Sequence, residues 1–341
     1  MMKPLPVFGM LLQMALSIVL PIVLPIVLQM DRAFAAPADD YPNRPITLVV
    51  PSTPGGGTDT SSRIIAPKFA ENLGQAIVIA NKPGVSGNIG AAFVANSAPD
   101  GYTLLTLISS HVINPHMFAK VGYDIDKDFT PISQTVTVPD VLIANKNLPV
   151  QNLAELMSYL KANPEKVNFG SAGMGSFSHL MMEFFALNAG VKMLHVPYKS
   201  TSQAFNDVLS NHVSMMVADI ALANPFIKTG ALKAYGVSSL GRSDIAPDIP
   251  SLSELGLKGF EANQWFGLVG PAKLPPQITE KIFNALKKTL ADPELKARLA
   301  ADGMTSSSNS SPQEFAGFIR SEGLKWSKII KEAKIETEKN Q

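Results

Sequence analysis

Short apolar runs alternate along the chain with stretches in which apolar residues recur at helical spacing. Ile46–Val50 has the length and β-branched content of a buried strand. Ile65, Phe69 and Leu73 then lie on one helical face, and residues 76–80 form a second apolar run. Strand, helix and strand in this order predict a βαβ unit with a parallel sheet and a right-handed crossover.

The same alternation continues to residue 269 and predicts an α/β fold. Further strands are expected at 103–108, 141–144, 167–170, 193–198, 213–218, 231–238 and 265–269. Asn152 and Glu155 have the spacing of a capping box, and Ser311-Pro312 marks the start of a last helix. The pattern between His111 and Val138 is irregular and predicts no regular element.

The first residues have the pattern of a secretory signal peptide. Lys3 precedes an apolar segment, and Ala33-Phe34-Ala35 is a small-x-small cleavage pattern. We expect cleavage after Ala35 and a periplasmic protein, with an uncleaved membrane anchor as the alternative. Roughly 300 residues would remain, which is the size at which one core tends to divide into two lobes.

Composition narrows the classes of partner. The chain has 29 Lys and Arg against 28 Asp and Glu, and cleavage would remove Lys3, Arg32 and Asp31, which balances the two signs. A neutral chain lacks the field that attracts nucleic acid, so no nucleic-acid partner is expected. There is no cysteine, which excludes disulfides, thiolate metal sites and Cys nucleophiles.

A glycine-rich turn at residues 51–59 joins the first expected strand to the first helix. Backbone N–H groups at such a helix start favour an anion. No Lys follows the glycines as a Walker loop requires, and Thr60 replaces the third glycine of the dinucleotide fingerprint. We therefore expect a carboxylate here, with a purely structural tight turn as the alternative.

Two further turns have the same character. Residues 81–90 run from a strand into a helix through Gly84, Gly87 and Gly90, and residues 171–178 do so with three serines and two glycines. Turns at the carboxyl edge of one sheet can converge on a ligand. Ser109-Ser110-His111 and Asp219 also follow strands; Asp219 could receive a ligand hydroxyl, ammonium or bridging water, or could cap the next helix.

The sequence also contains residues that could suggest a calcium site or a hydrolase. The acidic stretch 124–128 invites a calcium loop, but Phe129 and Thr135 stand where an EF-hand needs Gly and Glu, so a solvated loop is favoured and no metal is expected. A hydrolase could be assembled from Ser109 or Ser176, His111 or His179, and Asp59, but the chain has no G-x-S-x-G elbow. We expect no enzymatic activity and no cofactor.

Several motifs, in order along the chain, resemble one family. They are Tyr41-Pro42-x-x-Pro45-Ile46, the Pro-Gly-Gly-x-x-Asp of residues 54–59 read with one glycine offset, Asn81-Lys82-Pro83-Gly84 with Gly87-Asn88-Ile89-Gly90, Ala98-Pro99-Asp100-Gly101-Tyr102-Thr103, Ile113-Asn114-Pro115, His195-Val196-Pro197-Tyr198-Lys199 and Trp265-Phe266-Gly267. Together they resemble the Bug-type periplasmic solute receptors, the substrate-binding proteins of tripartite tricarboxylate transporters.

The resemblance implies a two-lobed periplasmic-binding-protein fold of type II, a Venus flytrap of two α/β lobes joined by two crossing strands. The crossings are expected near 138–143 and 264–269. Lobe 1 would comprise residues 36–138 and 267–341, and lobe 2 residues 139–266. A small carboxylate, including di- and tricarboxylates and aromatic acids, would bind in the cleft, and a monomer would deliver it to the membrane components of the transporter.

The resemblance also implies a set of ligand contacts, which are Ser52, Thr53, Gly55, Gly56, Gly57, Thr58, Asp59, Gly87, Asn88, Ser109, Ser110, His111, Ser171, Gly175, Ser176, Ser178 and Asp219. The set contains no Lys or Arg, so neutral donors and helix dipoles would hold the carboxylate. Ser52-Thr53 departs from the apolar pair common in the family, which adds hydroxyls to the site. A receptor that signals to a membrane sensor is the alternative to transport.

Overall fold

The alternating strands and helices build two separate sheets. The computed structural model describes residues 40–338, so the expected signal peptide lies outside the described residues. The first sheet has the order β11-β4-β10-β3-β1-β2. Its strands are β1 (Ile46–Val50), β2 (Ile77–Asn81), β3 (Thr103–Ile108), β4 (Phe129–Val138), β10 (Gln264–Pro271) and β11 (Thr305–Ser306). β1 pairs in parallel with β2 and β3, which confirms the predicted βαβ unit.

The second sheet has the order β7-β6-β8-β5-β9. Its strands are β5 (Asp140–Asn145), β6 (Asn168–Ser171), β7 (Leu194–Pro197), β8 (Met215–Asp219) and β9 (Leu232–Val237). β6 is parallel to β7 and β8, whereas β5 is antiparallel to β8 and β9. In the first sheet, β10 runs antiparallel to β3 and β4, so each sheet combines parallel and antiparallel strands.

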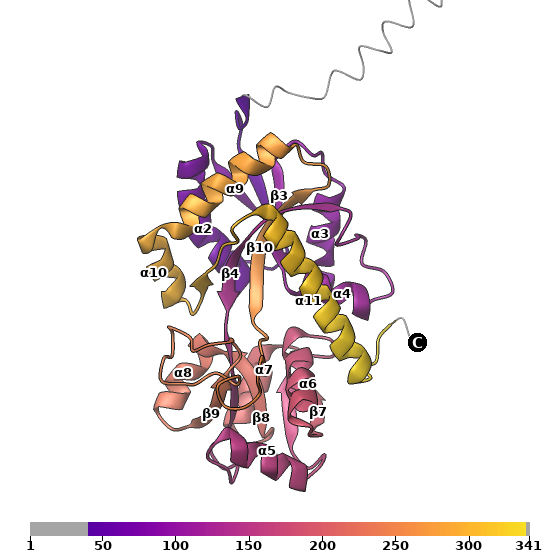
Figure 1. Ribbon diagram of the computed structural model, residues 1–341, viewed down its shortest axis with the longest axis vertical. Helices are drawn as coiled ribbons and strands as arrows, with labels where there is room; N and C mark the ends of the chain where they lie inside the picture. Colours follow the sequence, from indigo (N-terminus) through magenta and orange to yellow (C-terminus); the bar gives the residue numbers. More distant parts are fainter. Residues whose placement is uncertain (1–39, 339–341) are drawn as a thin grey trace, which may run out of the picture. The chain divides into compact units, whose positions relative to one another are not determined.

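Helices follow most of the strands, so that both sheets are covered (Figure 1). They are α2 (Gly57–Leu73), α3 (Asn88–Ala95), α4 (Ser110–Met117), α5 (Leu153–Ala162), α6 (Phe177–Ala189), α7 (Thr201–Leu209), α8 (Ile220–Lys228), α9 (Pro276–Ala291), α10 (Pro293–Ala301) and α11 (Pro312–Glu332), with a short 3₁₀ turn at Val85–Gly87. The predicted caps are confirmed: Asn152 accepts from the N–H of Glu155, and Ser311 accepts from that of Glu314. None of the helices in residues 40–338 is long and apolar enough to span a membrane.

Two connections join the sheets. β4 ends at Val138, and after Pro139 the chain enters the second sheet as β5 at Asp140; it returns as β10, whose first residue Gln264 pairs with Val138 (Figure 1). Two α/β sheets joined by two crossings confirm the predicted architecture. Residues 44–338 belong to one compact unit. The exact lobe boundaries remain a prediction.

The segment between His111 and Val138 is more regular than the sequence suggested. It contains α4 and the ten residues of β4. The sequence pattern did not indicate β4, because this strand buries polar residues and so lacks a clear alternation of apolar and polar positions. Residues 124–128, where a solvated loop was expected, lie in neither a helix nor a strand. Ser133 and Gln134 are buried and exchange hydrogen bonds with Asn309, Ser133 accepting through Oγ and Gln134 donating through its N–H.

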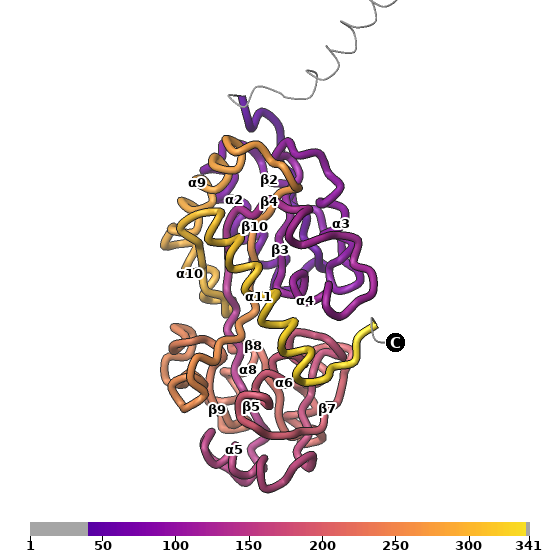
Figure 2. Tube along the Cα trace, turned by 45° about the vertical axis from the view of Figure 1, so that its right-hand side comes forward, coloured from indigo at the N-terminus to yellow at the C-terminus, as the bar shows by residue number. Residues whose placement is uncertain are grey.

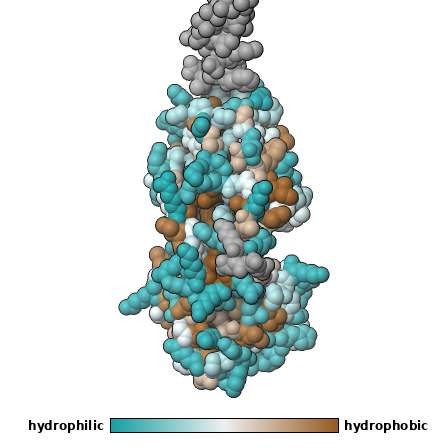
Figure 3. Space-filling view, turned by 90° about the vertical axis from the view of Figure 1, so that its right-hand side faces the viewer, coloured by the Kyte–Doolittle hydropathy of each residue, from teal (hydrophilic) through white to brown (hydrophobic). Residues whose placement is uncertain are grey.

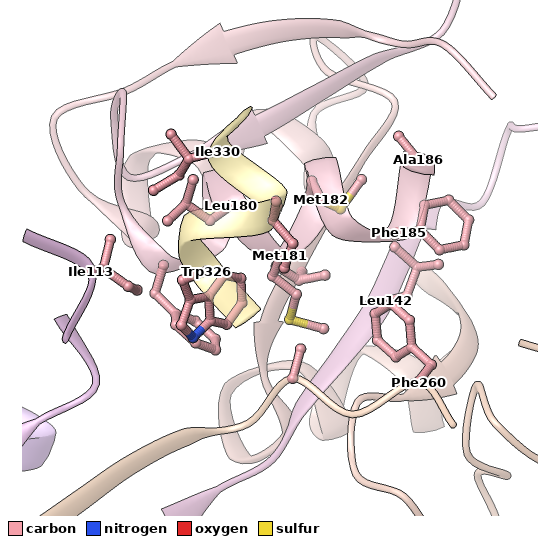
Figure 4. Packing of buried hydrophobic residues seen from close by; sticks show 14 of the residues in the cluster. Ile113, Leu142, Leu180, Met181, Met182, Phe185, Ala186, Phe260, Trp326 and Ile330 are labelled. Carbon is pink, nitrogen blue, oxygen red and sulfur yellow. The ribbon is translucent and has the colours of Figure 1, made fainter. Parts of the chain in front are cut away.

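α11 connects the two halves of the core. Figure 2 shows it running beside α4, and it also contacts α6 of the second sheet. Trp326 and Ile330 of α11 pack with Leu180 and Met181 of α6 (Figure 4), in a cluster of buried residues that draws on both sheets. The methionines of α6 are thus core residues.

Candidate functional site

The first glycine-rich turn is fixed by the carboxylate of Asp59. It accepts hydrogen bonds from the N–H of Gly55 (2.9 Å), Arg63 Nε (2.8 Å) and Asn81 Nδ2 (2.8 Å). These bonds, above all the one from Arg63, lower the pKa of the buried Asp59 to about 2. Asp59 is therefore charged at neutral pH, and its carboxylate is hydrogen-bonded to these neighbouring groups of the protein.

Asn81, at the end of β2, completes this support. Its Nδ2 also donates to the carbonyl of Ser52 (3.0 Å), while its Oδ1 accepts from Arg63 (3.1 Å). This role of Asn81 could not be predicted from the sequence, because the two turns come together only when β1 and β2 pair. The first intrahelical bond of α2 runs from Thr60 to Gly56, so the N–H groups of Gly57 and Thr58 precede it.

The second turn has an unusual backbone. Gly84, Val85, Ser86 and Gly87 have φ of 126°, 46°, 53° and 90°, a left-handed turn that includes a β-branched residue. The turn consumes its own N–H groups: those of Gly87 and Ile89 donate to the carbonyl of Gly84, and that of Asn88 to the carbonyl of Val85. The expectation that this turn offers free backbone N–H groups is thus not met at these three residues.

His111 supports the second turn from α4. Its Nδ1 accepts from the N–H of Ile108 (3.2 Å), so Nε2 carries the proton and donates to the carbonyl of Gly87 (3.2 Å). Complete burial lowers the pKa of His111 to about 4, which keeps the ring neutral. A Cβ on Gly87 would lie 2.7 Å from His111 Nε2, so a glycine is needed there.

Buried atoms without a hydrogen-bond partner mark this edge of the first sheet. Within residues 40–338 they include Ser52 Oγ and Asn88 Nδ2, one from each turn. The turns are in contact, because a Cβ on Gly90 would lie 3.1 Å from the Cβ of Pro51. Beside them, the N–H of Ser109 donates to the carbonyl of Trp265 (3.1 Å), and Ser110 begins α4.

The turn of the second sheet is bonded mainly to itself. The N–H groups of Ala172 and Gly175 donate to Ser178 Oγ (3.0 Å) and His179 Nδ1 (3.1 Å). Ser176 caps α6 by accepting from the N–H of His179. A Cβ on Gly175 would lie 2.7 Å from Met117 Cε of α4, so this turn lies against the first sheet's helices.

Two stacked imidazoles hold the second-sheet turn. His179 and His195 lie with ring centroids 3.9 Å apart, and His195 Nε2 lies 2.6 Å from Ser171 Oγ. Burial, and then the neighbouring imidazole of His179, lower the pKa of His195 to about 4. Sequence reasoning had not assigned His195 a role; only the parallel pairing of β6 with β7 brings it to Ser171.

Asp219 lies beside a second carboxyl group. It ends β8 opposite Asp140, and Gln264 Nε2 contacts Oδ1 of Asp219 (3.0 Å) and of Asp140 (3.5 Å). Burial, and then the charge of Asp219, raise the pKa of Asp140; burial also raises that of Asp219. Asp219 precedes α8 but makes no side-chain cap bond, so the capping alternative is not realised.

A cavity of about 320 Å³ lies between elements of the two sheets. Gly57 and Thr58 of α2 line it from one side, and Asp219 with Ala221 and Leu222 from the other. Gln264 closes it at the crossing strand. The helix start expected to hold an anion and the strand-end acid expected to face a ligand therefore share one cavity.

The polar residues considered for a hydrolase are hydrogen-bonded to other groups of the protein. Asp59 is bonded to Arg63, and His111 to the backbone of residues 87 and 108. His179 directs Nδ1 to a backbone N–H. The close serine–histidine pair is Ser171 with His195, in which the serine is fully buried. Asp59, His111 and His179 therefore use these polar atoms for bonds other than those of a nucleophile with its base.

The surface around the turns is partly apolar. Val85, Ile89 and Phe93 of the second turn and α3 are exposed large hydrophobic side chains, as is Met174 in the second-sheet turn. The face shown in Figure 3 has hydrophobic patches among hydrophilic ones.

Comparison with known proteins identifies the family. The model described as "Tripartite tricarboxylate transporter family receptor" (TctC) matches residues 61–335. Protein BugT of Bordetella pertussis is 34% identical over 302 residues, which cover 87% of this chain and 92% of that protein.

Two solved structures have the same architecture. R. palustris Rpa4515 with adipate is 31% identical, with a TM-score of 0.74, and the match covers 87% of this chain and 100% of that one. MatC from Rhodopseudomonas palustris with bound malate is 32% identical, with a TM-score of 0.70, over 85% and 100%. The fold is therefore the predicted two-lobed one, and the chain belongs to the TctC, or Bug-type, family of periplasmic solute-binding proteins.

Proposed function

We propose that this protein captures a small carboxylate, a di- or tricarboxylate or an aromatic acid, between its two lobes. A monomer then delivers it to the membrane components of a tripartite tricarboxylate transporter. The protein acts as a binding protein and not as an enzyme. The expected signal peptide would place it in the periplasm.

One observation supports this most. Two buried polar atoms, Ser52 Oγ and Asn88 Nδ2, come from adjacent turns and have no partner within the described residues. Buried polar groups are normally hydrogen-bonded, so an unpaired set marks a place where a ligand completes the bonding. The N–H groups of Gly57 and Thr58 add the positive end of α2.

The nature of the donors favours a carboxylate. No Lys or Arg belongs to the proposed contact set, and the one nearby guanidinium, that of Arg63, is paired with Asp59. Each hydrogen bond to a charged acceptor contributes about 1.5–3 kcal/mol. Several such bonds reach micromolar affinity, about −8 kcal/mol, after the cost of association. Rpa4515 with adipate and MatC with malate support the ligand class.

A thermal-shift panel tests the ligand class. Malate, adipate, succinate, citrate, glutamate and benzoate are compared with inorganic phosphate, and the strongest are titrated by calorimetry. A carboxylate at 100 times its Kd stabilises the fold by about 2.7 kcal/mol. Stabilisation by phosphate alone would reject the proposal, and so would a chemically altered carboxylate after incubation.

A pair of serine variants tests the location. Ser52→Ala removes an unpaired hydroxyl of the proposed site and lowers carboxylate affinity. Ser158→Ala removes an exposed hydroxyl on α5 and leaves affinity unchanged. Equal affinities of both variants and the parent would place the ligand elsewhere. In cells, loss of the gene should abolish carboxylate uptake; retained uptake with lost induction would favour the sensing role.

A further inference from the structure

The orientation of the Asn88 side chain is determined by a short chain of hydrogen bonds that begins at a backbone carbonyl. Asn114 Nδ2 of α4 lies 3.0 Å from the carbonyl oxygen of Ser86. A carbonyl oxygen only accepts hydrogen bonds, so the nitrogen of Asn114 must face it. The amide of Asn114 therefore has one orientation, although amide oxygen and nitrogen are similar in shape.

Asn114 in turn orients Asn88. The same Nδ2 lies 2.7 Å from Oδ1 of Asn88, and its second proton requires an acceptor there. The hydroxyl of Tyr123 lies 3.1 Å from this oxygen and 3.0 Å from the carbonyl of His111. The oxygen of Asn88 is thereby fixed toward α4, and its nitrogen is turned away.

Asn88 Nδ2 is then a buried donor that the rest of the described chain does not pair. Asn88 is 4% exposed and is the first residue of α3. The backbone N–H groups of residues 87–89 are already bonded within the left-handed turn. The side-chain amide of Asn88 is thus a buried donor of this turn that remains available to another molecule.

A second unpaired atom supports a ligand contact at Asn88 Nδ2. Ser52 Oγ belongs to the neighbouring turn, whose Pro51 lies 3.3 Å from where a Cβ on Gly87 would be. Each of the two touching turns therefore carries one buried polar atom that the described chain leaves unpaired.

We propose that Asn114 is a positioning residue: held by the Ser86 carbonyl, it orients Asn88 so that Asn88 Nδ2 donates to a carboxylate oxygen of the ligand. This inference rests on the proposed function, because it assumes that a carboxylate binds between the lobes. The positioning role also accounts for the left-handed turn. With φ above zero at Val85 and Ser86, the Ser86 carbonyl lies within hydrogen-bond distance of Asn114.

Three variants separate orientation from packing. Asn88→Asp keeps the oxygen that faces Asn114 but replaces the free donor with an acceptor, so affinity for malate or adipate falls by about 10- to 100-fold. Asn114→Leu keeps the volume but releases Asn88, so affinity falls as well. Asn96→Asp, at the exposed end of the same helix, is the matched control and binds as the parent does.

A spectroscopic measurement gives a readout that packing alone would not change. In protein labelled with ¹⁵N-asparagine, the Asn88 side-chain amide protons should resonate upfield of those of Asn114 without ligand. Malate or adipate should move the Asn88 protons downfield. In Asn114→Leu, the ligand-free Asn88 signals should shift and exchange faster with solvent.

Several outcomes would overturn the inference. They are equal affinity of Asn88→Asp and the parent, an Asn88 amide unmoved by a carboxylate that binds, or a tightly held water on Asn88 in both states. If the parent binds none of the panel, the proposed function fails and the donor role with it. The ligand-free spectra of the parent and Asn114→Leu still decide whether Asn114 orients Asn88.

Discussion

At the scale of single residues, polar side chains selected from the sequence hold the turns in place. Asp59 and His111 were predicted to contact the ligand, and both use their polar atoms on neighbouring backbone or side chains. Direct ligand contact by either remains a prediction. Glycine and serine clusters after strands are local signals, so the sequence could locate these turns between strand and helix. Their role in ligand binding remains a prediction. The partners Asn81, Asn114 and His195 are brought in by strand pairing and helix packing, which a single sequence does not show.

Replacement of Gly87 tests the support of the second turn. Gly87→Ala places a Cβ 2.7 Å from His111 Nε2 at φ 90°, so unfolding free energy should fall by about 2 kcal/mol or more. Urea denaturation measures the change. Gly323→Ala in α11 meets no atom within 4 Å and should stabilise the fold by about 0.5–1 kcal/mol. Equal effects of the two substitutions would contradict the proposed contact.

The buried His111 makes stability depend on pH. Its pKa is about 4 in the fold against 6.5 for an ordinary imidazole, so the unfolded chain binds a proton more readily. The contribution is complete above pH 6.5 and is lost as pH falls toward 4. Between pH 7 and pH 4.5 the loss is about 2 kcal/mol.

Denaturation of the parent and of His111→Gln at these two pH values isolates this contribution. His195 acts in the same direction and is present in both proteins, so it cancels in the comparison. Asp59, with its pKa of about 2, affects stability below this window. The same pH slope in both proteins would show that His111 is not the titrating group.

At the scale of elements, β-branched runs were predicted well and buried polar segments poorly. Ile46–Val50 and Thr103–Ile108 have the predicted bounds, because buried strands of this kind consist of short runs of mostly apolar residues. β4 was missed because Ser133, Gln134 and Thr135 are buried through bonds to a segment far along the chain. α4 was missed because Pro115 lies inside it.

Helix α11 is fixed to β10 through one carboxylate. Glu322 Oε2 accepts from the indole N–H groups of Trp265 (3.0 Å) and Trp326 (3.1 Å). Glu322→Leu would leave both buried donors unpaired, so unfolding free energy should fall by about 2–4 kcal/mol. Glu332→Ala, at the exposed end of the same helix, should change it by less than about 0.5 kcal/mol. Similar denaturation midpoints for the two variants would contradict this role.

At the scale of the whole molecule, two sheets joined by two connections permit a change in their separation. The two-lobed architecture could be predicted because many weak motifs occur in family order, although each alone says little. The position of α11 could not be predicted from the sequence, because its contact with α6 depends on how the two sheets are joined. Cleft closure itself remains a proposal.

Ligand binding should shift the protein toward a closed state. A carboxylate that contacts both lobes binds the closed state more tightly and so raises its population. X-ray scattering should show a smaller radius of gyration with saturating malate or adipate than with phosphate. Unchanged dimensions with a carboxylate that calorimetry shows to be bound would argue against closure.

The shared partner of the two indoles has a practical consequence. The chain contains two tryptophans, Trp265 on a crossing strand and Trp326 on α11, and both donate to Glu322. The carbonyl of Trp265 also receives the N–H of Ser109, which begins the turn into α4. All indole fluorescence therefore originates at one junction between the crossing strand and the core, so the unlabelled protein carries its own optical probe of this junction.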